Sequence, residues 1–142
     1  MRIQDVMTKN VVSVPKEMAV SMARTRLRNE EIDHLVIVDG KRVVGVVSSK
    51  DMLRADDDKP LSAVMNRLVV TIAPDATLRR AAGIMRGRAV GCLPVIDEGR
   101  LVGIVTTSDL LTALARGQAH AASPSDRVIL RKRGPRKRAF PI

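Results

Sequence analysis

The feature that most constrains the fold is an internal repeat: the chain matches itself without a gap at an offset of 58 positions. Val6-Met7 falls on Val64-Met65, and Gly45 falls on Gly103. A repeat of this length indicates two copies of one structural unit. Two similar units usually pack around a pseudo-two-fold axis, and the grooves between them are natural ligand sites.

The repeat also sets the expected organisation of the chain. We predict a first repeat at 1–58, a second repeat at 59–117, and a linker with a basic tail at 118–142 that is disordered and dispensable for folding. Both repeats read as β-α-β-β-α from their apolar periodicity and turn signals, which gives an α+β fold. The predicted strands are 11–14, 35–38, 43–47, 69–72, 93–96 and 101–105, and the predicted helices are 17–29, 48–55, 75–87 and 106–114.

Composition narrows the class of protein. The 142 residues are 45% hydrophobic, yet no apolar run approaches the ~20 residues of a membrane span. The N-terminus lacks the apolar stretch of a signal peptide, and a single cysteine permits no disulfide within the chain, so we expect a cytoplasmic protein without a membrane partner. One Phe and no Trp or Tyr exclude an aromatic platform for single-stranded nucleic acid in the repeats.

The ordered motifs resemble a tandem pair of cystathionine-β-synthase (CBS) domains, also called a Bateman module. They are Leu35-Val36-Ile37-Val38-Asp39 and Gly45-Val46-Val47-Ser48-Ser49-Lys50-Asp51, with copies at 93–97 and 103–109, and the resemblance covers 3–114. It implies a regulatory module, not an enzyme, that binds AMP, ADP, ATP or S-adenosylmethionine between its repeats. It further implies no required cofactor, a homodimer, and an effector protein that receives the signal.

Two matching pairs, Ser48-x-x-Asp51 and Thr106-x-x-Asp109, follow the last strand of each repeat. Their spacing is close to that of a capping box at a helix N-terminus. The resemblance instead assigns the aspartates to the ribose hydroxyls of a nucleotide, and both roles stay open here. Lys50, where the second copy has Ser108, suits either a phosphate contact in one site only or a solvated lysine on the first helical turn.

The segment before each central strand differs between the copies: the first has Asp33-His34 and the second has Gly91-Cys92. The resemblance places this backbone beside the base, and a protonated His34 could meet a phosphate. The two sites are therefore expected to differ. Together, the expected ligand-binding residues are Asn10, Val11, His34, Leu35, Val36, Ser48, Lys50, Asp51, Leu68, Val69, Cys92, Leu93, Pro94, Thr106, Ser108 and Asp109.

No residue pattern indicates catalysis or a metal. His34 and Cys92 stand at equivalent positions, but one His and one Cys are too few for a structural zinc site. A Cys nucleophile would need a partnered catalytic His. The sequence therefore predicts neither a metal site nor an enzyme.

The tail and the apolar surface leave other functions open. Residues 126–142 hold seven Lys or Arg against one acid, which suits either a solubilising tail or non-specific contact with nucleic acid through Arg131, Lys132, Arg133, Arg136, Lys137 and Arg138. One alternative function is thus a nucleic-acid-associated dimer, and another is a structural dimerisation module with empty sites. The apolar residues expected in the dimer contact are Met18, Met22, Leu53, Leu111 and Leu114.

Overall fold

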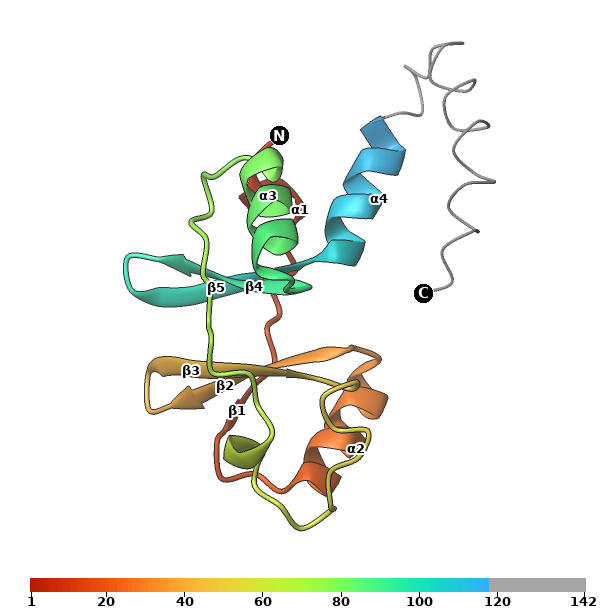
Figure 1. The fold of residues 1–142 in the computed structure, drawn as a ribbon. Helices are drawn as coiled ribbons and strands as arrows, with labels where there is room; N and C mark the ends of the chain where they lie inside the picture. Colours follow the sequence, from red (N-terminus) through yellow and green to blue (C-terminus); the bar gives the residue numbers. More distant parts are fainter. Residues whose placement is uncertain (118–142) are drawn as a thin grey trace, which may run out of the picture. The chain divides into compact units, whose positions relative to one another are not determined.

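The computed structural model describes residues 1–117, so the predicted basic tail at 118–142 lies outside the described residues. By its contacts the chain divides into two compact units, 1–110 and 111–142, and the first unit contains both repeats up to the first turn of the last helix. The α+β class predicted from the sequence is confirmed (Figure 1). The elements are α1 (Ile3–Val6), β1 (Ser13–Pro15), α2 (Val20–Glu30), β2 (His34–Asp39), β3 (Arg42–Ser48), the 3₁₀ turn η1 (Leu61–Ala63), α3 (Leu78–Arg88), β4 (Cys92–Asp97), β5 (Arg100–Thr106) and α4 (Thr107–Gly117).

Each repeat is built on a β-hairpin that carries a helix. In the first repeat, β2 lies between β1, its parallel neighbour, and β3, its antiparallel neighbour. In the second repeat, β4 and β5 form a two-stranded sheet. Figure 1 shows α2 beside the first sheet and α3 beside the second. The predicted turns after Asp39 and Asp97 are confirmed, with the glycines Gly40 and Gly99 at positive φ as tight hairpins favour.

The predicted strand at 69–72 is reduced to a single bridge between Ile72 and Val95. Proline explains the difference between the repeats. In the first repeat the amide of Val36 donates to the carbonyl of Val12 over 3.2 Å. Its counterpart is Pro94, which has no N–H to donate, so the pairing cannot extend in that direction.

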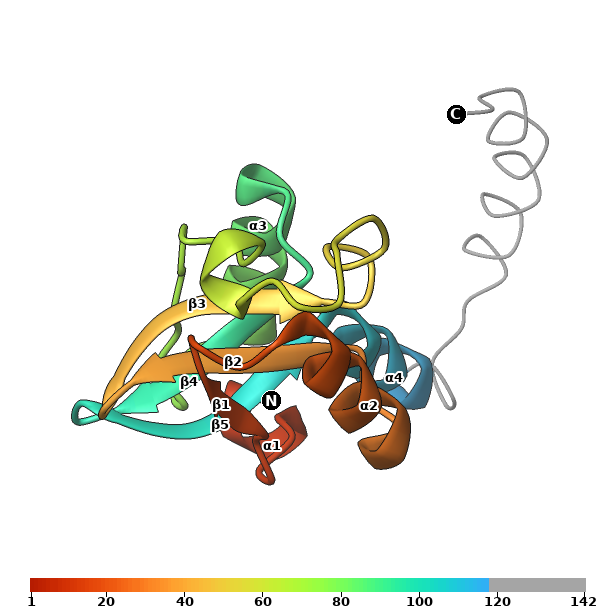
Figure 2. The ribbon, with the colours of Figure 1, turned by 90° about the horizontal axis from the view of Figure 1, so that it is seen from below.

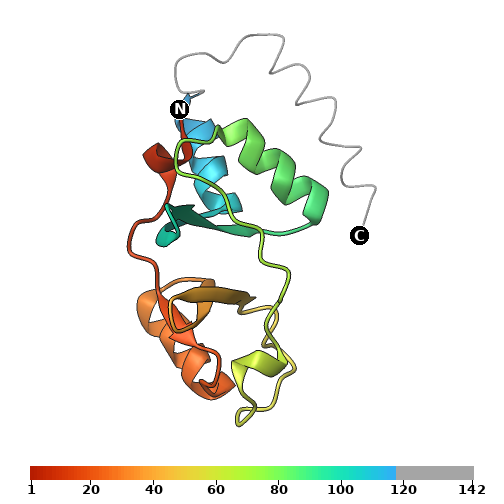
Figure 3. The same cartoon turned by 90° about the vertical axis from the view of Figure 1, so that its left-hand side faces the viewer.

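The opening segment of each repeat crosses to the other repeat. Residues 2–8 lie along the second repeat, where the amide of Ile3 donates to Ala76 over 2.9 Å and the amide of Thr8 donates to Ile104 over 2.9 Å. Residues 60–66 return the exchange, because the amide of Leu61 donates to Met18 over 2.9 Å. Figure 3 shows the two segments, red to orange and yellow to green, running from one sheet to the other on opposite sides of the molecule's repeat pair.

This exchange is reciprocal, as a pseudo-two-fold axis requires. The isolated bridges Thr8–Ile104 and Asn66–Val46 are counterparts at the same offset. The apolar side chains follow the backbone: Ile3 is fully buried in the core of the second repeat, and Leu61 is fully buried in the core of the first. The repeat in sequence is therefore not the packing unit, since each core is completed by the opening segment of the other copy.

The two sheets meet through a third, smaller cluster of apolar side chains. Val36 from β2 and Ile104 from β5 are buried in it together with Cys92 from β4. Figure 2, viewed from below, shows the strands of one sheet over those of the other. The contact between the repeats is thus aliphatic, as a chain with one aromatic residue requires.

The exchange also explains the paired glycines. A Cβ on Gly103 would lie 2.6 Å from Met7 Sδ and 3.0 Å from the Thr8 carbonyl oxygen. A Cβ on Gly45 would lie 2.6 Å from Met65 Sδ. Each glycine therefore leaves room for the crossing segment of the other repeat.

We expect Gly103→Val to lower the free energy of unfolding by about 1–3 kcal/mol, the usual cost of overpacking, because the Thr8 backbone cannot move aside as a side chain could. Gly83→Ala is the matched control, since a Cβ on Gly83 in α3 meets nothing within 4 Å. That change should stabilise by about 0.5–1 kcal/mol, because alanine favours the helix. Urea unfolding measures both; equal effects would contradict the close approach.

The helix predicted at 17–29 begins later, at Val20. The carbonyls of Lys16 and Met18 accept hydrogen bonds from Ser62 and Leu61, so the crossing segment uses groups that an earlier helix start would have needed. The predicted C-terminal ends of both long helices, 29 and 87, are each one residue short, since α2 ends at Glu30 and α3 ends at Arg88. Each is followed by a left-handed residue, Glu31 at φ 56° and Ala89 at φ 54°.

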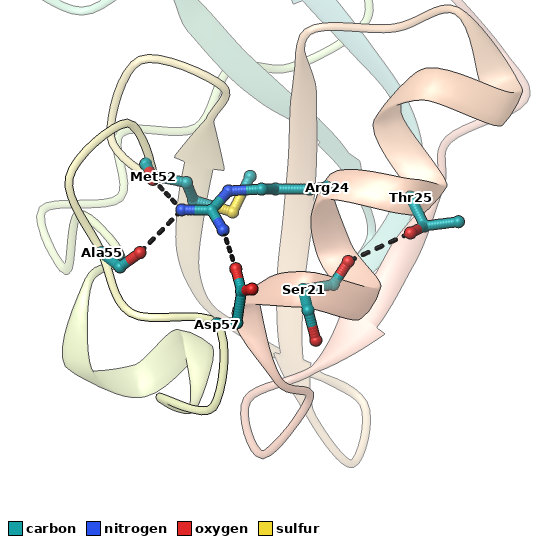
Figure 4. Close-up of polar contacts among 6 residues, drawn as sticks. All are labelled: Ser21, Arg24, Thr25, Met52, Ala55 and Asp57. Carbon is teal, nitrogen blue, oxygen red and sulfur yellow. Dashed lines mark hydrogen bonds and ion pairs between the residues drawn. The ribbon is translucent and has the colours of Figure 1, made fainter.

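The helix predicted at 48–55 is wrong: residues 49–54 form a run of turns. Figure 4 shows the reason, since the guanidinium of Arg24 binds the carbonyl oxygens of Met52 and Ala55 and the carboxylate of Asp57. These carbonyls then do not serve a helix. The counterpart of Arg24 in the second repeat is Ala82, which cannot make these contacts, and there α4 forms.

Candidate functional site

A cleft of about 260 Å³ lies between the repeats in the unit 1–110. Three segments line it: the strand-like lead at 8–12, the end of α2 with the start of β2 at 31–34, and the end of β5 with the start of α4. The first two belong to the first repeat and the third belongs to the second. The lining residues are Thr8, Asn10, Val11, Val12, Glu31, Ile32, Asp33, His34, Ile104, Thr106 and Ser108.

The fold brings these segments together through backbone pairing. Thr8 and Ile104 exchange two hydrogen bonds of 2.9 and 3.0 Å, which hold the lead of the first repeat against β5. Between them, His34 reaches across to the second repeat, where a Cβ on Gly91 would lie 3.9 Å from His34 Nε2. A molecule in the cleft would therefore contact both repeats.

Asp109 does not line the cleft itself but holds Thr106, which does. Its Oδ2 accepts from the Thr106 amide over 2.8 Å and from Thr106 Oγ1 over 3.1 Å, while the Asp109 amide donates to Thr106 Oγ1 over 3.3 Å. This is the capping box that the spacing predicts. All contacts to the carboxylate use Oδ2, so Oδ1 takes part in none of them, and a role toward a ribose stays a prediction.

Ser48 and Asp51 make the same pair of hydrogen bonds in the first repeat, where turns follow instead of a helix. Asp51 Oδ2 accepts from the Ser48 amide over 2.9 Å, and the Asp51 amide donates to Ser48 Oγ over 3.3 Å. Asp51 is exposed, whereas Asp109 is half-buried. The local chemistry is therefore shared by the two copies, but the surroundings are not.

Burial decides the charge of the two unusual side chains. Desolvation lowers the pKa of His34, although Asp33 and Asp51 act in the opposite direction, so the imidazole is neutral at neutral pH. Burial raises the pKa of the Cys92 thiol to about 12, and Asp109 adds to the rise. The thiol is therefore protonated at neutral pH and is a poor nucleophile.

Five of the residues expected from the sequence line this cleft: Asn10, Val11, His34, Thr106 and Ser108. Leu35, Val36 and Leu93 are fully buried core side chains, and Pro94 is also buried. The cleft does not include Ser48, Lys50, Asp51, Leu68, Val69 or Cys92, which stand at the 58-residue offset from Thr106, Ser108, Asp109, Asn10, Val11 and His34. Val69 instead lines a separate groove of about 620 Å³ with Arg42 and Arg67.

Sequence reasoning missed several lining residues. Thr8 and Ile104 face each other only because the lead crosses to the other repeat, which no local signal reveals. Glu31 and Asp33 flank the expected segment, and the acid-to-neutral contrast with Ala89 and Gly91 at the same offset was the available signal.

Within residues 1–117, no group of three His, Cys, Asp or Glu side chains is placed to hold a metal ion. No helix in the described part of the chain is both long and apolar enough to cross a membrane.

Comparison with known proteins identifies the family. The CBS domain model matches residues 3–58 and 61–116, and the chain therefore belongs to the CBS domain family, with two tandem CBS repeats.

Three relatives illustrate the similarity. Homoserine O-acetyltransferase of Methanocorpusculum labreanum is 33% identical over 115 residues, which cover 79% of this chain and 24% of that protein. The CBS domain pair of protein MJ0100, solved in complex with 5′-methylthioadenosine and S-adenosyl-L-methionine, is 29% identical with a TM-score of 0.75, covering 83% of this chain and 98% of that one. The cytosolic domain of the Mg²⁺ channel MgtE, solved in complex with ATP, is 35% identical with a TM-score of 0.67, covering 76% of this chain and 46% of that one. The chain spans about a quarter of the length of the first curated relatives it matches.

Proposed function

We propose that this CBS pair is a regulatory module that binds an adenosine-containing ligand in the cleft between its repeats and reports its presence to a partner protein. The observation that supports this most is the lining of the cleft, which combines His34 and Asn10 of the first repeat with Thr106 and Ser108 of the second. Two similar structures were solved with adenosine compounds. The volume of about 260 Å³ lies just below the roughly 300–1,000 Å³ of typical ligand sites, which suits a small ligand.

The cleft also supports a mechanism. A ligand that contacts both repeats binds best to one arrangement of them, and only this difference in affinity can shift the population toward that arrangement. The module needs no catalytic residue for such a task, and the effector protein is not identified by the chain. A cytoplasmic location for this CBS pair stays a prediction.

A direct binding screen tests the proposal. Calorimetry with 5′-methylthioadenosine, S-adenosylmethionine, AMP, ADP and ATP should give saturable binding for at least one of them, together with a raised melting temperature. Adenine-free phosphates serve as the control for simple charge effects. Failure of all five adenosine compounds to bind would remove the proposed function and favour a structural module with empty sites.

We also propose a homodimer formed through the helices of the repeats. Met22 in α2 is 60% exposed and Leu53 is 75% exposed, and Met22 borders an apolar groove with Met18. Leu111 and Leu114 in α4 are exposed as well. Light scattering should show twice the monomer mass, and Met22→Glu should shift it to the monomer, whereas Met22→Leu should not. A monomeric wild type at tens of micromolar, about the usual assay range, contradicts this proposal.

A further inference from the structure

The charge of the cleft separates the ligands that the proposed function leaves open. Glu31 and Asp33 both line it, and its other lining residues include no Lys or Arg. Neither acid takes part in the three ion pairs found among residues 1–117. Arg24 and Arg28 line a neighbouring depression that shares Ile32 and Asp33, but they do not line the cleft.

Three of the four amides at 106–109, at the helix end beside the cleft, already have hydrogen-bond partners. A free helix N-terminus attracts anions through its unpaired amides. Here the amides of Thr106 and Asp109 are used within the capping box. The Thr107 amide donates to the Gly91 carbonyl over 3.0 Å. The carboxylate of Asp109 adds a further negative charge at the same place.

The remaining titratable group among the lining residues is the imidazole of His34. Because burial lowers its pKa, it brings no positive charge to the cleft at neutral pH. A polyphosphate would therefore meet two carboxylates without a cation among the lining residues. Like charges brought together in this way reduce affinity strongly.

We infer that this cleft selects adenosine compounds that are neutral or positively charged, such as 5′-methylthioadenosine or a sulfonium nucleoside, and excludes nucleoside polyphosphates, with Glu31 and Asp33 as the residues that set this specificity. This inference rests on the proposed function and names its ligand class. The positively charged sulfonium and ammonium groups of S-adenosylmethionine would be attracted by the carboxylates of Glu31 and Asp33.

The counterpart positions at the 58-residue offset carry a more positive charge than the cleft residues. At the same offset, Glu31 is replaced by Ala89, Asp33 by Gly91 and Ser108 by Lys50. These replacements remove two negative charges and add one positive charge. They also supply a matched variant, because the same backbone positions already accept these residues, including the left-handed φ of 54° at Ala89.

The test follows the cleft itself by proton NMR of His34, one of the two histidines in the chain; His120→Gln assigns the two ring signals. In the wild type, 5′-methylthioadenosine and S-adenosylmethionine should shift the His34 signal, with ATP about tenfold weaker or worse. Salt should weaken S-adenosylmethionine but not the neutral 5′-methylthioadenosine. In the triple variant Glu31→Ala, Asp33→Gly, Ser108→Lys, the affinity of ATP relative to S-adenosylmethionine should rise about tenfold or more, because two negative charges are removed and one positive charge is added.

The outcomes separate the two proposals. If ATP binds the wild-type cleft as tightly as S-adenosylmethionine, or if the ratio is the same in the triple variant, the charge selection is wrong while the ligand-binding function stands. If none of the five adenosine compounds of the binding screen shifts the His34 signal, the cleft is not the adenosine site and both proposals fail.

Discussion

Asp109→Ala should weaken binding of an adenosine ligand in the cleft by about tenfold or more and should also lower stability. The affinity loss follows if Oδ1 accepts from the ribose hydroxyls, since a hydrogen bond to a charged group is worth about 1.5–3 kcal/mol. The stability loss follows from the capping box, in which Asp109 Oδ2 holds the Thr106 amide over 2.8 Å. Losing a cap of this kind costs about 0.5–2 kcal/mol.

Asp51→Ala is the matched control, because Asp51 makes the same hydrogen bonds with Ser48, which does not line the cleft, as Asp109 makes with Thr106, which does. It should lower stability by a similar amount and leave the affinity measured through His34 within about threefold, since only its Coulomb effect on His34 changes. Calorimetry and thermal unfolding measure the two effects separately. An unchanged affinity in Asp109→Ala would show that this aspartate is a helix cap and no more.

Leu61→Ala should lower the free energy of unfolding by about 2–5 kcal/mol, the usual cost of truncating a fully buried leucine. The exchange of opening segments makes a sharper prediction about where the damage falls. Leu61 belongs to the second repeat in sequence but packs in the core of the first, among Val14, Leu35 and Val47. Hydrogen exchange should therefore lose protection first in β2 and β3 rather than in β4 and β5.

Two further variants test the exchanged packing. Ile3→Ala, the counterpart change, should reverse the pattern and expose β4 and β5 first. Leu68→Ala changes a leucine that is 53% exposed and should alter stability by no more than about 0.5 kcal/mol. Loss of protection in the second repeat on Leu61→Ala would contradict the exchanged packing.

Much of the fold was predictable from the sequence because the repeat doubles every local signal. The central strands and the hairpin turns at Gly40 and Gly99 depend on neighbouring residues, and they are confirmed. The errors arise where distant residues act. Arg24 binds carbonyls about thirty residues away and replaces a helix with turns, and Pro94 removes the donor that its counterpart Val36 uses.

The site follows the same rule. Local spacing was enough to indicate both capping-box hydrogen-bond patterns, and the family resemblance selected His34, Thr106 and Ser108, which line the cleft. It could not combine them, because the cleft depends on residues 8–12 lying against the β5 strand of the other repeat. Only five of the sixteen expected residues line this cleft, and five others are buried.

The crossed opening segments bear on how such a chain could be divided. If the chain were cut at Lys59, each fragment would keep an opening segment that packs in the core of the other fragment. Its own hairpin would lose the opening segment that packs on it, Leu61 in the first core and Ile3 in the second. Neither fragment could complete its own core, because each would carry the opening segment that the other lacks. We therefore expect two such fragments, produced separately, to fold only when they associate with each other.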